Sequence, residues 1–319
     1  EEKDPLIPEI DTSVELQAGS RVAVVSKSTS GEFWGLVKKG MEQAIADVNE
    51  AYGFKKEDQV TMTFEGASDE KDVESQVNTI DAVIAENPDV LCVSASDMDS
   101  LQAQLEAAKE NGIPVVAFDS GVTDSKMIRA FRGTDNTRVG EIAAYRLATA
   151  IGKMGKVAVF SAQEKTQSIQ ERVSGFTNYI TNYPDIEVVE IVYQDQVDDM
   201  TAAMQEVLDK YPQLDGVFCD NADIADLYLD MKKDETKDSI VMVGVDATAK
   251  QQEAIWNSKE VGVVSQQPYA MGYQTIWTAL LTTAPKKSVE IKRNVRIDPA
   301  WIDSSNIDDP TYSSYLYAN

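Results

Sequence analysis

Two aspartates, Asp119 and Asp246, are the residues whose type and setting first point to binding chemistry. Each follows a short apolar run, and an earlier aspartate that opens a matching run lies 30 residues before the first and 31 before the second. Ligands of open α/β sheets bind outside the carboxyl ends of the strands, so the pair predicts one acceptor group in each half of the chain. A helix cap or a turn is the alternative for each aspartate taken alone.

Four other residues stand at a strand end or a helix start. Asn221 follows the run 217–219, with a helix cap as its alternative. Arg172 lies early in a predicted helix, with a solvated surface position as its alternative. Phe33 and Trp34 open the first predicted helix. Because neighbours on a helix point about 100° apart, both rings cannot face the core, and we expect one to face a ligand cleft.

The sequence has no histidine, and this excludes several kinds of active site. Ser-His-Asp and Cys-His catalysis, histidine-ligated zinc and histidine pH switches all need an imidazole. With 29 Lys and Arg against 54 Asp and Glu, the net charge is −25. Such a surface repels phosphate, so nucleic acid and anionic membranes are not expected as partners.

Motifs for cofactors and metals are missing as well. No Gly-x-Gly-x-x-Gly follows the first apolar run, and 152–155 lacks the spacing of a phosphate-binding loop. The acidic pairs at 198–199 and 308–309 lack the spacing of a calcium loop. We therefore expect neither a cofactor nor a metal. Cys92 and Cys219 lie in apolar runs and are expected to be buried free thiols.

Apolar periodicity divides the chain into strands that alternate with helices. This alternation predicts an α/β protein with two parallel sheets, and strands that are apolar throughout fit sheets covered on both faces. The expected strands are 21–26, 60–64, 90–93 and 115–118 in the first half, and 156–160, 188–193, 217–219, 240–245 and 261–264 in the second.

The ends of the chain differ from this pattern. Residues 1–20 are polar, contain Pro5 and Pro8, and are expected to form a leader or tether. The chain begins with Glu1 rather than Met, which indicates a processed or trimmed N-terminus. No apolar run approaches the roughly 20 residues of a membrane-spanning helix. The segment after Pro299 carries several aromatic residues and is expected to pack on a lobe or near a hinge, because an exposed aromatic tail is a liability.

Short motifs follow one another in a characteristic order between about Arg21 and Ile297. They are VVS at 24–26 with FW at 33–34, IPVVAFD at 113–119, GTDN at 133–136 with Gly140, ER at 171–172 with GF at 175–176, VFCDNAD at 217–223, VGVD at 243–246 and VVSQQP at 263–268. In this order and spacing the chain resembles the type I periplasmic sugar-binding proteins of the ribose and galactose group, which deliver sugars to ABC transporters.

The resemblance implies two doubly wound parallel-sheet lobes joined by a three-segment hinge, with one sugar in the cleft. The crossovers would fall near 134–135, 266–267 and Arg293. The expected N-terminal lobe is then 21–134 plus 267–293, and the expected C-terminal lobe is 135–266 plus 294–319.

The resemblance also implies the ligand-binding residues. The two aspartates would accept bonds from sugar hydroxyls, Phe33 would stack on a sugar face, Arg172 would donate a fork to adjacent oxygens, and two amides would both donate and accept. The full set is Phe33, Trp34, Asp119, Arg172, Asn221, Asp246 and Gln266.

Three further candidates are places where the chain departs from the family pattern. Ser120 stands where ribose binders carry an arginine, and Glu32 stands where smaller or amide groups are common. No second stacking aromatic is found at 194–197, where Asp195 lies. These departures favour an aldohexose such as glucose or galactose over ribose.

The expected function is an extracytoplasmic receptor that delivers a monosaccharide to the permease of an ABC importer, as a monomer and without catalysis. It would be periplasmic, or anchored by lipid to the outer face of the cell membrane. A pentose, a nucleoside or a signalling furanone is an alternative ligand. The sensory core of a LacI-type repressor shares the fold, but no helix-turn-helix is found and the charge is unfavourable. A carbohydrate-active enzyme that uses Asp119 and Asp246 is an alternative of another class.

Overall fold

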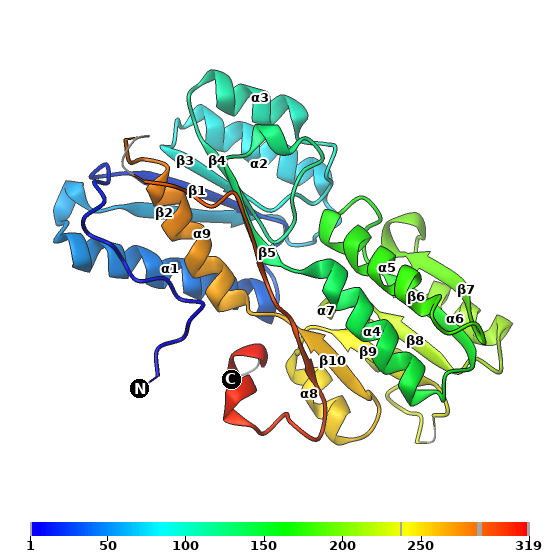
Figure 1. Ribbon diagram of the computed structural model, residues 1–319. Helices are drawn as coiled ribbons and strands as arrows, with labels where there is room; N and C mark the ends of the chain where they lie inside the picture. Colours follow the sequence, from blue (N-terminus) through cyan, green and yellow to red (C-terminus); the bar gives the residue numbers. More distant parts are fainter. Residues whose placement is uncertain (1, 237, 286–288, 318–319) are drawn as a thin grey trace. The chain divides into compact units, whose positions relative to one another are not determined.

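The computed structural model describes residues 2–236, 238–285 and 289–317, which form two compact α/β units (Figure 1). Unit 1 comprises Glu1–Thr134, Lys165–Gln167 and Pro268–Ile297, and unit 2 comprises Asp135–Glu164, Ser168–Gln267 and Asp298–Asn319. The predicted fold class, two parallel-sheet lobes, is confirmed. In the described ranges no helix is both long and apolar enough to cross a membrane.

Unit 1 is built around a parallel sheet that has six strands in the described residues, in the order β11-β5-β4-β3-β1-β2. Helices α1 and α9 pack together on one face, and α2 and α3 cover the other (Figure 1). The elements are β1 (Arg21–Ser26), α1 (Glu32–Tyr52), β2 (Thr61–Gly66), α2 (Val73–Ala85), β3 (Val90–Val93), α3 (Gln102–Glu110), β4 (Val115–Phe118), β5 (Ala130–Thr134), α9 (Pro268–Leu281) and β11 (Asn294–Ile297).

Unit 2 has a sheet of the same design, with six strands among its described residues in the order β12-β10-β9-β8-β6-β7. Only β12 runs antiparallel to its neighbour within these strands. The elements are α4 (Asn136–Ala150), β6 (Gly155–Ser161), α5 (Gln167–Ile180), β7 (Ile186–Tyr193), α6 (Met200–Lys210), β8 (Gly216–Cys219), α7 (Ala222–Met231), β9 (Val241–Val245), α8 (Ala249–Trp256), β10 (Gly262–Ser265) and β12 (Ala300–Ile302).

The two sheets share one strand order, and this order explains the match between the two halves of the sequence. From one edge, β2-β1-β3-β4-β5 corresponds to β7-β6-β8-β9-β10, and each sheet then adds one late strand, β11 or β12. Strands β4 and β9 are therefore equivalent. The central strands β3, β4, β8 and β10 are buried along their whole length, which is why they are apolar without alternation.

The units differ from the expected lobes in three places. Residues 294–297 belong to unit 1 rather than to the C-terminal lobe, because β11 pairs with β5. Lys165–Gln167 also belongs to unit 1, where the Thr166 hydroxyl donates to the Ser96 carbonyl oxygen. Gln267 belongs to unit 2, one residue beyond the expected boundary.

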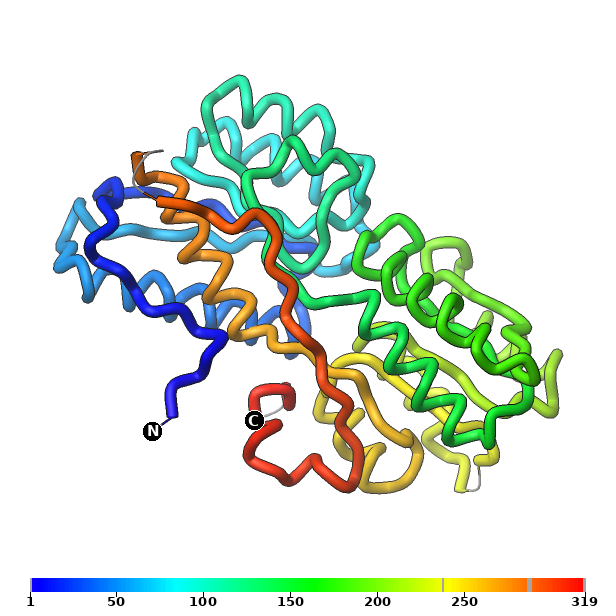
Figure 2. The backbone as a smooth tube through the Cα atoms, in the orientation of Figure 1, coloured from blue at the N-terminus to red at the C-terminus, as the bar shows by residue number. Residues whose placement is uncertain are grey.

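Residues 2–20, which belong to the segment expected to form a tether, lie along unit 1 (Figure 2). The Tyr52 hydroxyl donates to the Val14 carbonyl oxygen at 2.6 Å, and the Gln274 side chain donates to the Leu6 carbonyl oxygen at 2.7 Å. Val14 and Leu16 are buried. This segment is therefore held by contacts with the folded unit from Leu6 onward, and its role as a tether stays a prediction.

Candidate functional site

The matched aspartates occupy equivalent positions at the carboxyl ends of β4 and β9. Asp119 has φ 62° and Asp246 has φ 79°, a left-handed conformation that is uncommon for any residue except glycine. Both side chains are nearly buried, with 3% and 4% of their surface exposed. Strained backbone of this kind persists only where the surroundings hold it, and it clusters at functional sites.

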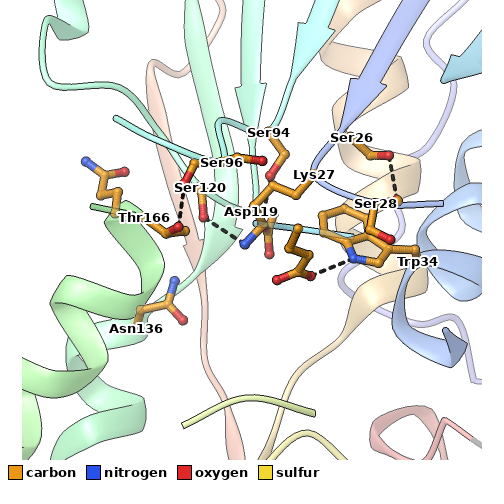
Figure 3. A network of polar contacts seen from close by, with 12 residues as sticks. Ser26, Lys27, Ser28, Trp34, Ser94, Ser96, Asp119, Ser120, Asn136 and Thr166 are labelled. Atoms are coloured by element: carbon orange, nitrogen blue, oxygen red, sulfur yellow. Dashed lines mark hydrogen bonds and ion pairs between the residues drawn. The ribbon is translucent and has the colours of Figure 1, made fainter. Parts of the chain in front are cut away.

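Asp119 lies in a network of polar side chains at the strand ends of unit 1 (Figure 3). Its Oδ2 accepts a hydrogen bond from the Ser94 hydroxyl at 2.7 Å and lies 2.9 Å from Lys27 Nζ. Lys27 also donates to the Ser120 hydroxyl at 3.2 Å and is only 4% exposed. The carboxylate is therefore balanced by a buried ammonium group that the sequence analysis did not single out.

Lys27 could have been suspected from its position, because it directly follows β1 at the carboxyl end of the sheet. The residue after Asp119, where the resemblance implies an arginine, is Ser120. In this chain the positive charge beside Asp119 comes from Lys27, the residue after β1, instead of from the residue that follows the aspartate.

Trp34 provides the aromatic surface of this cluster. The Lys27 ammonium lies 5.7 Å from the Trp34 ring centroid, and the Trp34 ring meets Phe118 edge to face at 6.4 Å. The Trp34 Nε1 group donates to Glu70 Oε1 at 2.8 Å. Trp34 is thus fixed by packing on one side and by a hydrogen bond on the other.

Phe33 and Trp34 are both buried, and the expectation that one of the two rings faces a ligand cleft stays a prediction. They are 9% and 3% exposed, and their rings meet edge to face at 5.0 Å. Two adjacent helix residues can both be buried here, because Trp34 packs on the sheet residue Phe118 while Phe33 packs on Trp34 itself. Glu32, a weaker candidate, is exposed at the start of α1.

Ser96 adds an unsatisfied hydroxyl to this end of unit 1. Its backbone is fixed, since its N–H donates to Gln76 and its carbonyl oxygen accepts from Thr166. Its buried Oγ has no hydrogen-bond partner among the described residues. Because buried hydroxyls are nearly always paired, this atom is a place where a ligand or a water molecule would bind.

Asp246 is the centre of the corresponding cluster in unit 2. Its Oδ1 accepts from Gln266 Nε2 and from the Tyr317 hydroxyl, both at 2.7 Å, and its Oδ2 accepts from the Ala222 backbone N–H at 2.8 Å. Two of the predicted site residues, Asp246 and Gln266, are thus joined by a hydrogen bond. Tyr317 is a member of this cluster that the sequence analysis placed only in an aromatic tail.

Asn221 caps a helix, which is the alternative that the sequence left open. Its Oδ1 accepts from the Ile224 backbone N–H at 2.9 Å, and the residue is the N-cap of α7, two positions after the end of β8. Only 7% of its surface is exposed. This hydrogen bond uses the side-chain carbonyl oxygen of Asn221 and thereby fixes the orientation of its NH₂ group.

Arg172 is buried, so the alternative of a solvated surface position is wrong. It is 3% exposed on α5, its Nε donates to Asn136 Oδ1 at 2.9 Å, and its Nη1 donates to the Asp220 carbonyl oxygen at 2.9 Å. Burial raises the pKa of Asp220 to about 6, while the Ser161 hydroxyl and Arg172 oppose that rise. Arg172 is therefore held at the strand ends of unit 2 by two bonds.

Asp195 is not brought into this cluster. It is exposed in a short 3₁₀ turn after β7, where it accepts from the Glu164 backbone N–H at 3.4 Å. The aromatic residue at this edge is Tyr193, the last residue of β7 and two positions before Asp195. Burial, followed by the acids Glu164, Asp220 and Asp195, raises the Tyr193 pKa.

The described residues contain no group of three His, Cys, Asp or Glu side chains that could hold a metal ion. Cys92 and Cys219 are buried free thiols, as predicted. Burial raises the pKa of both thiols, so neither is a reactive thiolate. The chemistry of both clusters is therefore that of hydrogen-bond donors and acceptors around a carboxylate.

A family model described as "Periplasmic binding protein domain" matches residues 22–284, most of the chain. The chain belongs to this family.

Relatives of known name support this membership. The chain is 27% identical over 203 residues to the ribose import binding protein RbsB of Bacillus subtilis, covering 64% of this chain and 66% of that protein. It is 26% identical over 216 residues to a D-ribose/D-allose-binding protein of Pseudomonas aeruginosa, covering 64% and 63%. The match thus spans a little under two thirds of the length of these relatives.

Solved structures agree over a longer range. An ABC transporter solute-binding protein from Agrobacterium vitis with bound D-fucose has a TM-score of 0.85 and 28% identity, covering 93% of this chain and 100% of the other. A carbohydrate transporter solute-binding protein from Agrobacterium radiobacter in complex with D-arabinose has a TM-score of 0.83 and 28% identity, covering 94% and 99%.

Proposed function

We propose that this protein is the solute-binding component of an ABC importer and that its ligand is a neutral monosaccharide. The observation that carries the proposal is the pair of equivalent aspartates at strand ends. Each is nearly buried in a left-handed conformation and surrounded by fixed donors. The sugar-binding relatives and the sugar-bound structures support the same ligand class.

The chemistry of the two clusters suits an uncharged polyol. A sugar hydroxyl donates one hydrogen bond and accepts others, so it can donate to Asp119 while it accepts from Lys27. Asp246 with Gln266 offers the same combination of acceptor and donor. We propose that both clusters contact one sugar, with Trp34 or Phe33 against a C–H face of the ring and with Arg172 and Asn221 as further contacts.

The departures at Ser120, Glu32 and Asp195 favour an aldohexose such as glucose or galactose. Among the ligands named for the relatives and the similar structures, allose and D-fucose have the six-carbon aldose skeleton, whereas ribose and D-arabinose are pentoses. An aldohexose is our proposal, and a pentose, a nucleoside or a furanone is an outcome of the test.

The remaining parts of the proposal concern the setting of the protein. We propose that it acts outside the cytoplasm, periplasmic or held on the outer face of the cell membrane by a lipid. We further propose that it binds its sugar as a monomer without converting it, and then docks on a membrane permease. The family supports a binding role over an enzymatic one.

The test is thermal unfolding against a panel of aldohexoses, pentoses, nucleosides and furanones, followed by calorimetric titration and a turnover assay for any compound that binds. The expected result is a sugar that stabilises the protein and is recovered unchanged. Consumption of the sugar would favour the enzyme that uses Asp119 and Asp246. Binding confined to nucleosides or furanones, or no shift with any sugar, would overturn the proposed ligand class.

A further inference from the structure

The C-terminal segment of the described chain is an integral part of unit 2. Strand β12 pairs antiparallel with β10, so the chain returns to the sheet that carries Asp246 on the neighbouring strand. A short 3₁₀ helix, Pro310–Tyr315, follows. The sequence analysis expected this segment to pack on a lobe or near the hinge, and the structure places it on unit 2.

The segment is held by both polar and apolar contacts. The Ser265 hydroxyl donates to the Tyr315 carbonyl oxygen at 2.6 Å, and the Tyr317 backbone N–H donates to the Ala247 carbonyl oxygen at 3.0 Å. Ile302 and Ile307 belong to a small hydrophobic core that they share with Ala247, Ile255 and Val263 of the same unit. The partly buried residues packed against this core include Tyr312, Tyr315 and Leu316.

These contacts place the Tyr317 hydroxyl beside Asp246 and Gln266 of the candidate site. Tyr317 is 2% exposed, and its hydroxyl donates to Asp246 Oδ1 at 2.7 Å while it accepts from the Gln266 backbone N–H at 3.2 Å. Gln266 Nε2 donates to the same carboxylate oxygen. One phenol thus joins the residue after β9 to the residue after β10.

We infer that Tyr317 is a positioning residue of the ligand site, which holds Asp246 and Gln266 in the geometry that binds the ligand. This inference rests on the proposed function. Asp246 has a left-handed backbone that needs external support, and Tyr317 holds its carboxylate while the backbone N–H of Tyr317 holds the next residue, Ala247. A tyrosine side chain is well suited to this role, because its rigid ring and few rotatable bonds hold the hydroxyl at a fixed distance from the backbone.

The first experiment compares Tyr317→Phe with Tyr315→Phe by calorimetric titration of the sugar identified by the panel. Tyr315 is the matched control, because it lies in the same segment and its hydroxyl donates a long 3.4 Å bond to the Asp298 carbonyl oxygen, away from Asp246. Removing a hydrogen bond to a buried carboxylate is expected to weaken binding about ten- to hundred-fold for Tyr317→Phe, against less than about two-fold for Tyr315→Phe. Equal affinities of Tyr317→Phe and the wild type would overturn the inference.

A second measurement separates positioning from a general loss of structure. Tyr317→Phe and Asp246→Asn are each titrated with a series of monodeoxy analogues of the bound sugar. If Tyr317 acts through Asp246, these two variants lose affinity for the same analogues. Both then lose little affinity for the analogue that lacks the hydroxyl bound by Asp246. A uniform loss for every analogue would overturn the inference, since it would show a general structural effect.

The outcomes also separate this inference from the proposed function. A wild-type protein that binds no sugar would overturn both. A wild-type protein that binds a sugar, with Tyr317→Phe binding it equally well, would overturn the role of Tyr317 alone and leave the sugar-binding function standing.

Discussion

At the scale of single residues, the candidate site shows what a sequence can and cannot reveal. Asp119 and Asp246 could be predicted, because a strand end is a local feature and the two halves of the chain repeat it. Their partners Lys27 and Tyr317 could not be predicted in the same way. A lysine in a polar loop is ordinarily solvated, and Tyr317 lies 71 positions from Asp246, so only tertiary structure pairs them.

The buried pair of Lys27 and Asp119 leads to the first prediction. Lys27→Met leaves a buried carboxylate without its counter-charge, which is expected to lower the free energy of unfolding by about 3–5 kcal/mol and to weaken sugar binding. Denaturant unfolding and calorimetric titration measure the two effects. Lys71→Met is the control, because Lys71 forms an exposed ion pair with Asp69 at 3.5 Å and is expected to change stability by less than about 1 kcal/mol.

A double variant tests the same prediction if Lys27→Met alone does not fold. Lys27→Met with Asp119→Asn removes both charges together, so it is expected to recover most of the lost stability while sugar binding stays weak. If the double variant binds sugar like the wild type, the pair has no part in binding. If Lys27→Met alone is as stable as the wild type, the pair is not buried in solution.

Glu260 leads to a prediction about pH. It is 1% exposed, and burial raises its pKa well above the ordinary value, against the opposing effect of a hydrogen bond with the Gln251 side chain. The folded state therefore holds a proton that the unfolded state releases above its ordinary pKa of about 4.5. The contribution of Glu260 to stability is thus favourable in acid and is lost as the pH rises through the raised pKa.

Glu260→Gln removes this titration and is expected to stabilise the protein at neutral pH. The gain over the wild type should grow with pH from about 4.5 upward, by at most about 1.4 kcal/mol per pH unit, and should level off above the raised pKa. Urea unfolding at a series of pH values measures it, with the exposed Glu253→Gln as control. A difference between Glu260→Gln and the wild type that does not change with pH would contradict the prediction.

At the scale of elements, close helix pairs hold each sheet together on one face. A Cβ atom on Gly40 of α1 would lie 2.0 Å from the Tyr269 carbonyl oxygen of α9, and one on Gly140 of α4 would lie 2.1 Å from the Arg172 carbonyl oxygen of α5. In both units a glycine therefore lets two helix backbones approach closely. The second contact also bears on the site, because α5 carries Arg172.

Gly40→Ala is predicted to destabilise the protein by about 1–3 kcal/mol, because the added carbon forces two helix backbones apart. Gly35→Ala on the same helix is the control. Nothing lies within 4 Å of a Cβ at Gly35, so the better helix propensity of alanine is expected to raise stability by about 0.5–1 kcal/mol. Thermal unfolding measures both variants. Equal effects of the two substitutions would show that α1 and α9 are not in close contact.

The three strands that the sequence did not predict share a physical reason. Strand β5 contains Arg132 and Gly133, and β12 has three residues, so neither shows an apolar run. Strand β11 has four residues, two of them polar, and becomes a strand only because β5 is beside it. Backbone pairing between distant segments creates these strands, and local periodicity cannot reveal that pairing.

At the scale of the whole molecule, the net charge is −25, while the charged groups of the two clusters are held by local contacts. Lys27 lies 2.9 Å from Asp119, and the charge of Arg172 opposes the rise in the Asp220 pKa that burial causes. Asp246 accepts hydrogen bonds from the neutral donors Gln266, Tyr317 and the Ala222 N–H. We therefore expect the repulsion among surface charges and the hydrogen bonding of a neutral ligand to be largely separate. The ion pairs Lys3–Glu9 and Lys250–Asp230 lie at the surface and are too exposed to offset the general repulsion. Salt should therefore act differently on stability and on binding.

The last prediction follows from that separation. Raising NaCl from about 0.01 M to about 1 M shortens the Debye length from about 30 Å to about 3 Å and screens the repulsion between surface carboxylates, so the melting temperature is expected to rise. The Kd for a neutral sugar should change by less than about two-fold, because its binding releases no counterions. Thermal unfolding and titration at matched salt concentrations measure the two quantities, with a neutral osmolyte as control. A Kd that changes steeply with salt would mean that the ligand is charged, and it would contradict the proposal of a neutral monosaccharide.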